Sequence, residues 1–126
     1  GVKIRMIVRG ICCLLPGVPK RTENIDIVNV VSRYLEHSRV YIFGSGKKER
    51  MYISSADLMT RNTEKRVELA FPVIDPKVRS RIKNTLLLNY MDNVKGRRLD
   101  SEGCYRRKDA MGESVNSQQR LMEEQI

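Results

Sequence analysis

Residues 32–46, SRYLEHSRVYIFGSG, contain the only histidine of the 126-residue chain, His37. An imidazole with an unperturbed pKa of ~6.5 can donate or accept a proton near neutral pH, which makes His37 the first candidate for acid–base chemistry. A single histidine is nevertheless most often a structural or surface residue. The residues around it therefore decide its assignment.

Two arginines indicate which ligand His37 would face. Arg39 lies two residues after His37, and residues two apart share one face of a strand. Arg9 interrupts the apolar run 3–15, where a guanidinium needs an anionic partner to offset its desolvation. A phosphate held between guanidinium groups and an imidazole would satisfy both conditions, so the pattern predicts a phosphoryl or phosphodiester site.

A second polar group follows in residues 52–69, YISSADLMTRNTEKRVEL. Turn formation and surface ion pairs explain such residues when they are taken one by one. As a set placed after a strand, they favour additional contacts to phosphate, and we single out Ser55, Asp57 and Arg61.

Composition limits the class of partner. The chain has 24 Lys and Arg against 15 Asp and Glu, a formal charge of +9, which attracts polyanions. Trp is absent and Phe occurs twice, so an aromatic base-stacking platform is not expected. The three cysteines form no disulfide or metal-binding pattern, which favours a reducing, cytosolic setting, and no apolar run approaches the about 20 residues that span a bilayer.

Apolar patterning predicts five strands, over residues 3–15, 25–31, 39–43, 50–56 and 65–73. The first is apolar on both alternating faces, which is typical of a strand covered on both sides. The third and fourth are joined by GSGKKE, a connection typical of a hairpin.

A helix is predicted from Pro76, with Asp75 as its N-cap, because apolar residues recur at helical spacing as far as Val94. The polar residues 95–114 are expected to form a loop or a partly ordered tail. Ser114 is expected to cap a short terminal helix anchored by Leu121 and Met122.

This order of elements predicts an α/β or α+β fold, a mixed sheet flanked by helices in a single domain. We expect that domain to occupy residues 1–108, with residues 109–126 as a C-terminal tail that carries the short helix. The chain opens without Met, almost directly in a strand pattern, which indicates a piece of a longer protein.

Several long motifs together resemble the carboxy-terminal catalytic domain of bacterial polyphosphate kinases: IRMIVRGICCLLPG, RYLEHSRVYIF, YISSADLMTRN, KRVELAFPVIDP, DNVKGR and SQQRLMEE. The resemblance covers essentially the whole chain. It implies a phospholipase-D-like fold and a role in the reversible transfer of the terminal phosphate of ATP to inorganic polyphosphate through a phosphohistidine.

The resemblance also implies site residues and partners. The phosphorylated histidine belongs to the preceding domain, so this chain would be inactive alone. The family's phosphate-contacting arginine falls on Arg9 and its assisting histidine on His37. The implied partners are ATP or ADP, inorganic polyphosphate, the rest of the same polypeptide and further copies in a homo-oligomer, with no nucleic acid. Mg²⁺ is expected in the full-length enzyme, with its ligands outside this chain and no metal site within it. The implied location is the cytoplasm, including the inner face of the membrane as a peripheral site.

Two alternatives stay open. In phospholipase D enzymes the half-site reads His-x-Lys, four residues and an Asp, whereas here His37-Ser38-Arg39 is followed at that place by Gly44. This difference argues against a phosphodiesterase or nuclease half-site. The charge alone would also permit a non-catalytic polyanion-binding module.

Overall fold

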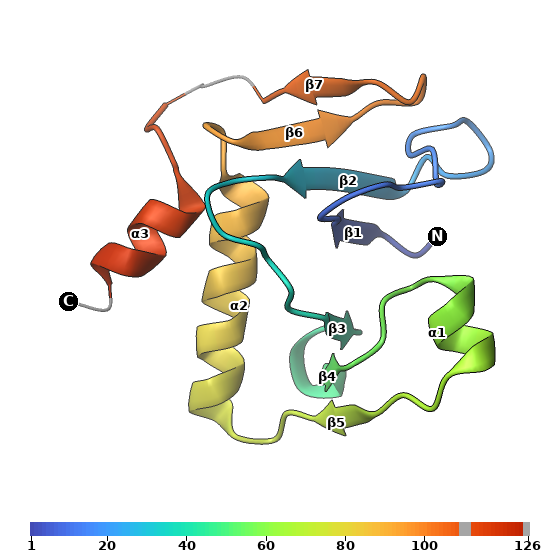
Figure 1. The fold of residues 1–126 in the computed structure, drawn as a ribbon, viewed down its shortest axis with the longest axis vertical. Helices are drawn as coiled ribbons and strands as arrows, with labels where there is room; N and C mark the ends of the chain where they lie inside the picture. The colour runs from blue at the N-terminus through green and yellow to red at the C-terminus, as the bar shows by residue number, and fades with distance from the viewer. Residues whose placement is uncertain (109–111, 125–126) are drawn as a thin grey trace. The chain divides into compact units, whose positions relative to one another are not determined.

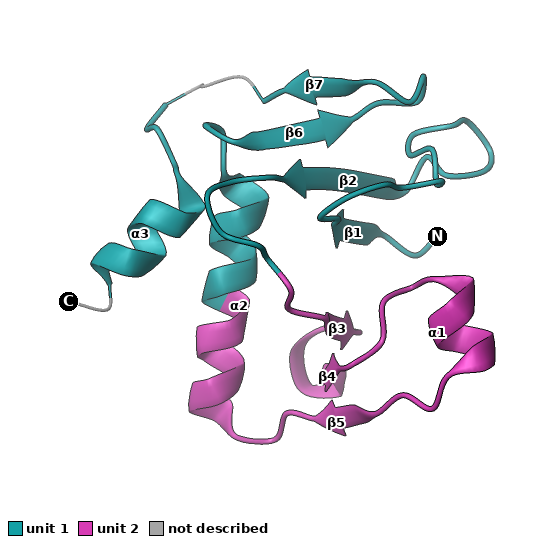
Figure 2. Cartoon of the chain, viewed as in Figure 1, with its two compact units in different colours: residues 1–36, 84–126 teal, residues 37–83 magenta. Residues whose placement is uncertain are grey.

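The computed structural model describes residues 1–108 and 112–124; residues 109–111 and 125–126, at the two ends of the expected tail, lie outside the described residues. The chain divides into two compact units (Figure 2). Unit 1 is drawn from residues 1–36 and 84–126, and unit 2 from residues 37–83. The expected mixed α/β class is confirmed.

Unit 1 contains a four-stranded mixed sheet in the order β1-β2-β6-β7 (Figure 1). Its strands are β1 Ile4–Ile7, β2 Ile25–Val30, β6 Gly96–Leu99 and β7 Tyr105–Arg107. β1 and β2 run parallel, and the other neighbours are antiparallel. The core lies around the central strand β2, where Ile27, Val28 and Val30 are buried. The sequence correctly predicts this strand because β-branched residues fill both of its faces.

Unit 2 contains an antiparallel sheet in the order β3-β4-β5. Its elements are β3 Val40–Phe43, the short 3-10 helix η1 Gly46–Lys48, β4 Arg50–Ser54, helix α1 Thr60–Lys65 and β5 Ala70–Pro72. The expected hairpin between β3 and β4 is confirmed. Gly44 lies in its connection with φ +76, a backbone angle that glycine adopts without strain.

Helix α2, Pro76–Met91, begins where the sequence predicts. Asp75 Oδ1 accepts hydrogen bonds from the backbone N–H groups of Lys77, at 2.8 Å, and Val78, at 2.9 Å. The carboxylate thereby satisfies donors that the first helical turn leaves unpaired. The first half of α2 belongs to unit 2 and the second half to unit 1.

The first strand is much shorter than expected. β1 ends at Ile7 instead of Leu15, and Ile11 is 97% exposed. β1 pairs only with β2, so it is the edge of its sheet and is not covered on both sides. The apolar run misled the prediction because it continues into a connection that forms no strand.

Two other segments differ from expectation because their patterns are weak. Only Ala70–Pro72 of the expected strand 65–73 is a strand, and the polar sequence before it forms α1, which the apolar periodicity did not reveal. The expected loop 95–114 contains β6 and β7. Their arginine-rich sequences carry almost no apolar alternation, and β7 is exposed along its length.

The terminal helix α3, Ser117–Glu123, is capped by Asn116 and not by Ser114. Asn116 Oδ1 accepts from the backbone N–H of Gln119 at 3.3 Å. Met122 is 42% exposed, so it does not anchor the helix as expected; the residues of α3 that are buried are Ser117 and Gln118. In the described ranges, no helix has the length and apolar character needed to cross a membrane.

Candidate active site

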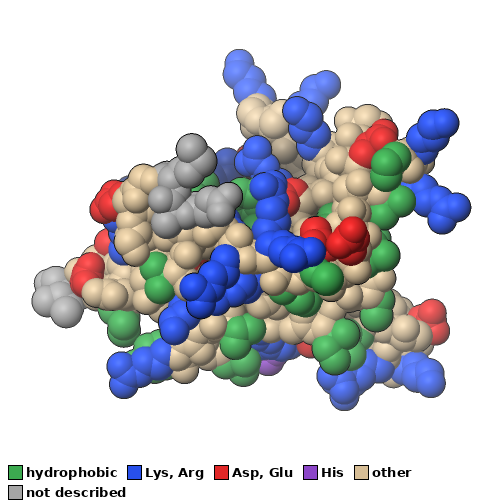
Figure 3. Space-filling view, turned by 90° about the horizontal axis from the view of Figure 1, so that it is seen from above, with side chains coloured by type: hydrophobic (Ala, Val, Ile, Leu, Met, Phe, Trp, Pro, Cys, Tyr) green, Lys and Arg blue, Asp and Glu red, His purple; other side chains and the backbone are tan. Residues whose placement is uncertain are grey.

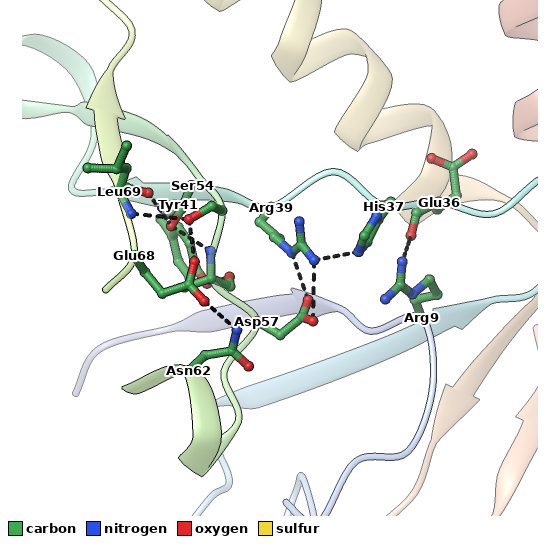
Figure 4. Close-up of polar contacts among 12 residues, drawn as sticks. Arg9, Glu36, His37, Arg39, Tyr41, Ser54, Asp57, Asn62, Glu68 and Leu69 are labelled. Atoms are coloured by element: carbon green, nitrogen blue, oxygen red, sulfur yellow. Dashed lines mark hydrogen bonds and ion pairs between the residues drawn. The ribbon is translucent and has the colours of Figure 1, made fainter. Parts of the chain in front are cut away.

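The side chains of His37 and Arg39 meet in unit 2, where Arg39 Nη2 hydrogen-bonds to His37 Nε2 (Figure 4). His37 is exposed and precedes β3, which starts at Val40, so it is not itself in the strand. The extended two-residue spacing still brings both side chains to one side, as their alternation predicts. A guanidinium has donors only, so Nε2 accepts in this arrangement and the ring proton lies on Nδ1.

Asp57 holds Arg39 in place from the turn after β4. Arg39 Nε donates to Asp57 Oδ1 at 2.8 Å and Nη2 to Oδ2 at 3.3 Å, with both side chains about three-quarters buried. The hydrogen bonds to Asp57 raise the pKa of Arg39, so the guanidinium stays charged. Within the described ranges, Nη1 of Arg39 donates no hydrogen bond. The pair therefore presents an oriented cation next to an imidazole.

Tyr41 fixes the turn that carries Asp57. Its hydroxyl donates to the carbonyl of Ala56 at 3.1 Å, directly before Asp57. Burial raises the pKa of Tyr41, and the negative charge of Asp57 raises it further. Sequence reasoning missed this residue, although Tyr41 lies two positions after Arg39 and shares its strand face.

Ser55 is held in a second polar group in the same unit. Its hydroxyl donates to Glu68 Oε2 and accepts from the backbone N–H of Leu69 at 3.1 Å. Asn62 Nδ2 donates to the other Glu68 oxygen at 2.6 Å. These hydrogen bonds, the one from Ser55 foremost, lower the pKa of Glu68. Ser55 thus connects the turn after β4 with the segment that contains Glu68 and Leu69. Sequence reasoning missed the part that Glu68 plays in this group.

The remaining expected phosphate contact of unit 2, Arg61, lies exposed on α1. The side chain of Arg61 forms no hydrogen bond or ion pair with another of the residues described, although its backbone is part of helix α1. The structure therefore brings together His37, Arg39 and Asp57, places Ser55 in a neighbouring network and leaves Arg61 outside both.

Arg9 belongs to unit 1, where it follows the end of β1. Its Nη1 donates to the backbone carbonyl of Glu36 at 3.1 Å (Figure 4). The expectation of a buried guanidinium that requires an anion is wrong, because Arg9 is half-buried and a carbonyl oxygen supplies its partner. The side-chain carboxylate of Glu36 accepts in turn from Gln118 Nε2 at 2.8 Å. This contact orients Arg9 and leaves its charge without a neutralising carboxylate.

Gly44 occupies the place where the phospholipase D pattern has an aspartate. A Cβ at this position would lie 3.1 Å from the carbonyl oxygen of Lys48, and φ is +76. Both the backbone angle and the close carbonyl disfavour a carboxylate side chain here. The local geometry therefore agrees with the departure from that pattern seen in the sequence.

One group of side chains has the composition of a metal site. Asp100, Glu102 and Cys104 bring one ligand atom each within 4.8 Å of one another. Arg106 already pairs with both carboxylates of this group, with Asp100 at 2.8 Å and with Glu102 at 3.5 Å. A thiol and an arginine-paired carboxylate do not fit Mg²⁺, which prefers oxygen ligands and water.

Lys and Arg outnumber Asp and Glu in this chain, 24 to 15. Figure 3 shows Lys and Arg side chains standing out in groups over one face of the molecule, with fewer Asp and Glu side chains between them. The formal charge of +9 gives this surface a field that attracts phosphate-rich ligands.

Comparison with known proteins agrees with these features. The family model described as polyphosphate kinase C-terminal domain 2 matches residues 1–119. The chain is 49% identical to the polyphosphate kinase of Staphylococcus epidermidis over 126 residues, which cover all of this chain and 17% of that protein. It is 56% identical to the polyphosphate kinase of Bacillus cereus over 105 residues, which cover 83% of this chain and 15% of that protein.

A solved structure agrees with the fold. The crystal structure of the polyphosphate kinase from Porphyromonas gingivalis matches with a TM-score of 0.90 and 41% identity, covering 98% of this chain and 20% of that one. This match confirms the phospholipase-D-like fold class. The chain spans about one-sixth of the length of the curated relatives it matches. The chain belongs to the polyphosphate kinase C-terminal domain family.

Proposed function

We propose that this chain supplies His37, Arg39 and Arg9 to a phosphotransferase that moves the terminal phosphate of ATP reversibly to inorganic polyphosphate. Its relatives are named polyphosphate kinases, and they are several times longer than this chain. The nucleophilic histidine is assigned to the rest of the polypeptide, so this chain assists the transfer and does not carry the phosphoryl group.

The observation that carries the proposal is the position of Arg39 between Asp57 and His37. Phosphoryl transfer has a loose transition state with charge on the phosphoryl oxygens, so catalysis depends on positioning and positive charge. A guanidinium held by Asp57 keeps its orientation at little entropic cost. An arriving phosphoryl group would compete with the imidazole for Nη2 of Arg39.

Competition for Nη2 of Arg39 would allow His37 to act as a proton donor. While Arg39 donates to Nε2, the imidazole cannot donate from that atom. When phosphoryl oxygens take the guanidinium donors, Nε2 becomes free to bind a proton beside the dianion. His37 would then give this proton to the bridging oxygen as the bond between that oxygen and the terminal phosphorus of ATP breaks, and ADP leaves.

Arg9 would contribute a second cation. Its guanidinium contacts a carbonyl and no carboxylate within the described part of the chain, so its charge is available to an anion. It would offset charge on the phosphoryl oxygens in the transition state. Mg²⁺ is expected to be held by residues elsewhere in the polypeptide.

The test uses the full-length protein that carries this chain. His37→Ala should lower polyphosphate synthesis from ATP roughly 10²–10⁴-fold, the usual contribution of a general acid, with unchanged thermal unfolding because His37 is exposed. Ser38→Ala, at the exposed neighbouring position, is the matched control and should keep the parent rate. Parent turnover in His37→Ala, or stable labelled phosphate on His37 after incubation with ATP, would contradict the assisting role.

A further inference from the structure

A cavity of about 830 Å³ opens in unit 1, on the part of the sheet where β1 and β2 begin. It is lined from residues 3–5, 16–17 and 23–26, from Tyr90 of α2 and from residues 98–101 and 106–108. β1 and β2 are parallel, so the first residues of both strands lie at one end of the strands and the last residues of both lie at the opposite end. Arg9 and Glu36 follow the ends of these strands, whereas the cavity includes their starts. The cavity is therefore separate from the Arg9 contact.

Cations outnumber carboxylates two to one in the cavity lining. Arg98 pairs with Asp26 at 2.6 Å, and Arg106 pairs with Asp100 at 2.8 Å. Among the residues described, the other four cations of the lining form no ion pair: Lys3, Arg5, Arg107 and Lys108. A volume within the usual range of small-ligand sites thus carries a surplus of positive charge.

Lys108 is the most deeply placed of these four cations. It is half-buried, and its Nζ donates to the backbone carbonyl of Tyr90. Burial lowers the pKa of Lys108, so an anion in the cavity would stabilise its charged form. The carboxylates of Asp92 and Asp26 offset only part of the cost of this burial. A desolvated cation that forms no ion pair is stabilised by a ligand that pairs with it.

The lining does not favour a nucleobase. Tyr90 is its only aromatic side chain, and the ring is already contacted by two cations, Arg5 at 5.6 Å and Lys108 at 5.3 Å from its centroid. The Tyr90 hydroxyl is also engaged, since it donates to Asp26. The cavity therefore offers charge for phosphoryl groups and no free aromatic face for stacking a base.

We propose that this cavity is a second binding site for inorganic polyphosphate, which Lys3, Arg5, Arg107 and Lys108 hold through phosphoryl oxygens. The choice of ligand rests on the proposed function. A linear phosphate chain matches the unpaired cations without needing a stacking surface. The site would retain the chain by contacts that take no part in the transfer of phosphate.

The test measures binding of inorganic polyphosphate to the full-length protein by titration calorimetry, without ATP. Lys3→Glu/Arg107→Glu reverses two exposed cations that have no hydrogen-bond partner among the described residues, so the fold should tolerate it. We expect roughly tenfold weaker binding and a salt slope reduced by about 1 to 2, because each lost phosphate contact lowers that slope.

Lys47→Glu/Lys48→Glu in η1 is the matched control, since it changes the net charge equally at two exposed lysines outside the cavity. It should weaken binding less than twofold. Equal losses in both double variants would show a general charge effect and overturn the site, as would unchanged binding in the cavity variant. If the reversal variant does not fold, Lys3→Gln/Arg107→Gln provides the same comparison.

A second titration uses ATP as the probe, and binding that the cavity variant weakens as strongly as polyphosphate binding would overturn the assignment to a bare phosphate chain. These measurements need no turnover. A failure of the proposed function, seen as parent activity in His37→Ala, would therefore be distinguishable from a failure of this site.

Discussion

Gln118 pairs through its side-chain amide with the backbone of Tyr34, as a neighbouring strand would. Tyr34 N donates to Gln118 Oε1 at 2.9 Å, and Gln118 Nε2 donates to the Tyr34 carbonyl at 2.8 Å, across 84 residues of sequence. Nε2 also donates to the carboxylate of Glu36, whose backbone carbonyl accepts from Arg9. The buried amide thereby holds the segment that leads into His37.

Gln118→Ala should lower activity of the full-length protein roughly tenfold, because the Glu36 contact that orients Arg9 loses its support. Steady-state kinetics should show the loss in kcat more than in KM. In an Arg9→Ala background, Gln118→Ala should cost little more, since both act through one contact. Gln119→Ala, at an exposed position of the same helix, is the control. Fully additive losses would show that Gln118 contributes only to stability.

Arg39→Lys should lower kcat/KM of the full-length protein by roughly 10- to 100-fold, although the charge is kept. An ammonium cannot reproduce the fork with which Arg39 reaches both Asp57 and His37. Asp57→Asn should have a similar effect because it weakens the same orientation. Arg61→Lys, at an exposed position of α1, should leave the kinetics unchanged. Parent kinetics in Arg39→Lys would argue against a positioned guanidinium.

Gly44→Ala should destabilise the chain more than Gly46→Ala. Both glycines have positive φ, +76 and +55, so both substitutions carry backbone strain of about 1–3 kcal/mol. Only at Gly44 would the new Cβ also lie 3.1 Å from a carbonyl oxygen, whereas nothing lies within 4 Å at Gly46. Thermal or urea unfolding of the two variants measures the difference. Equal midpoints would show that the hairpin moves to relieve the contact.

The buried carboxylate of Asp92 should make the free energy of unfolding depend on pH in the acid range. This carboxylate is fully buried and accepts from the N–H groups of Val94, Lys95 and Gly96 through Oδ1, and from Ser117 through Oδ2. Burial alone would raise the pKa of Asp92, but these hydrogen bonds outweigh it and lower the pKa below its ordinary 3.8.

Because the folded-state pKa is below the unfolded one, the stabilisation is complete above the ordinary range of an aspartate and is lost as the pH falls through the folded-state pKa. Asp92→Asn should cost about 2–4 kcal/mol at neutral pH, since an amide cannot accept from donors on both sides. The variant should also lose less stability than the parent between about pH 5 and pH 2. Urea unfolding across this range measures both effects, and parallel curves would contradict the assignment.

Local signals predicted some elements well. β2, the β3–β4 hairpin and the start of α2 follow from β-branched content, turn residues and an Asp-Pro cap, which act over a few positions. β1 could not be bounded, because its end depends on its place at the edge of the sheet. β6 and β7 were not predicted because their sequences are rich in arginine and lack apolar alternation. The pairing of Arg98 in β6 with Asp26, 72 residues away, is set by tertiary structure.

In the candidate site, too, contacts between residues close in sequence could be predicted, and contacts set by tertiary structure could not. The contact between His37 and Arg39 follows from their two-residue spacing. The sequence predicts Asp57 as a contact to ATP or phosphate, whereas its bond to Arg39 depends on the chain returning across 18 residues. Glu68 and Gln118 carried no signal, because their partners are set by tertiary structure.

The hydrogen bonds from Ser117 to Asp92 have a consequence for the synthesis of the chain. Asp92 and Ser117 close a loop of 25 residues, and the next residue, Gln118, pairs with Tyr34. A nascent chain on the ribosome therefore carries His37 long before the groups that fix the preceding segment have been made. The segment before His37 can therefore become ordered only late in synthesis. A product truncated before residue 117 lacks the side chains of Ser117 and Gln118, which bond to Asp92 and Tyr34.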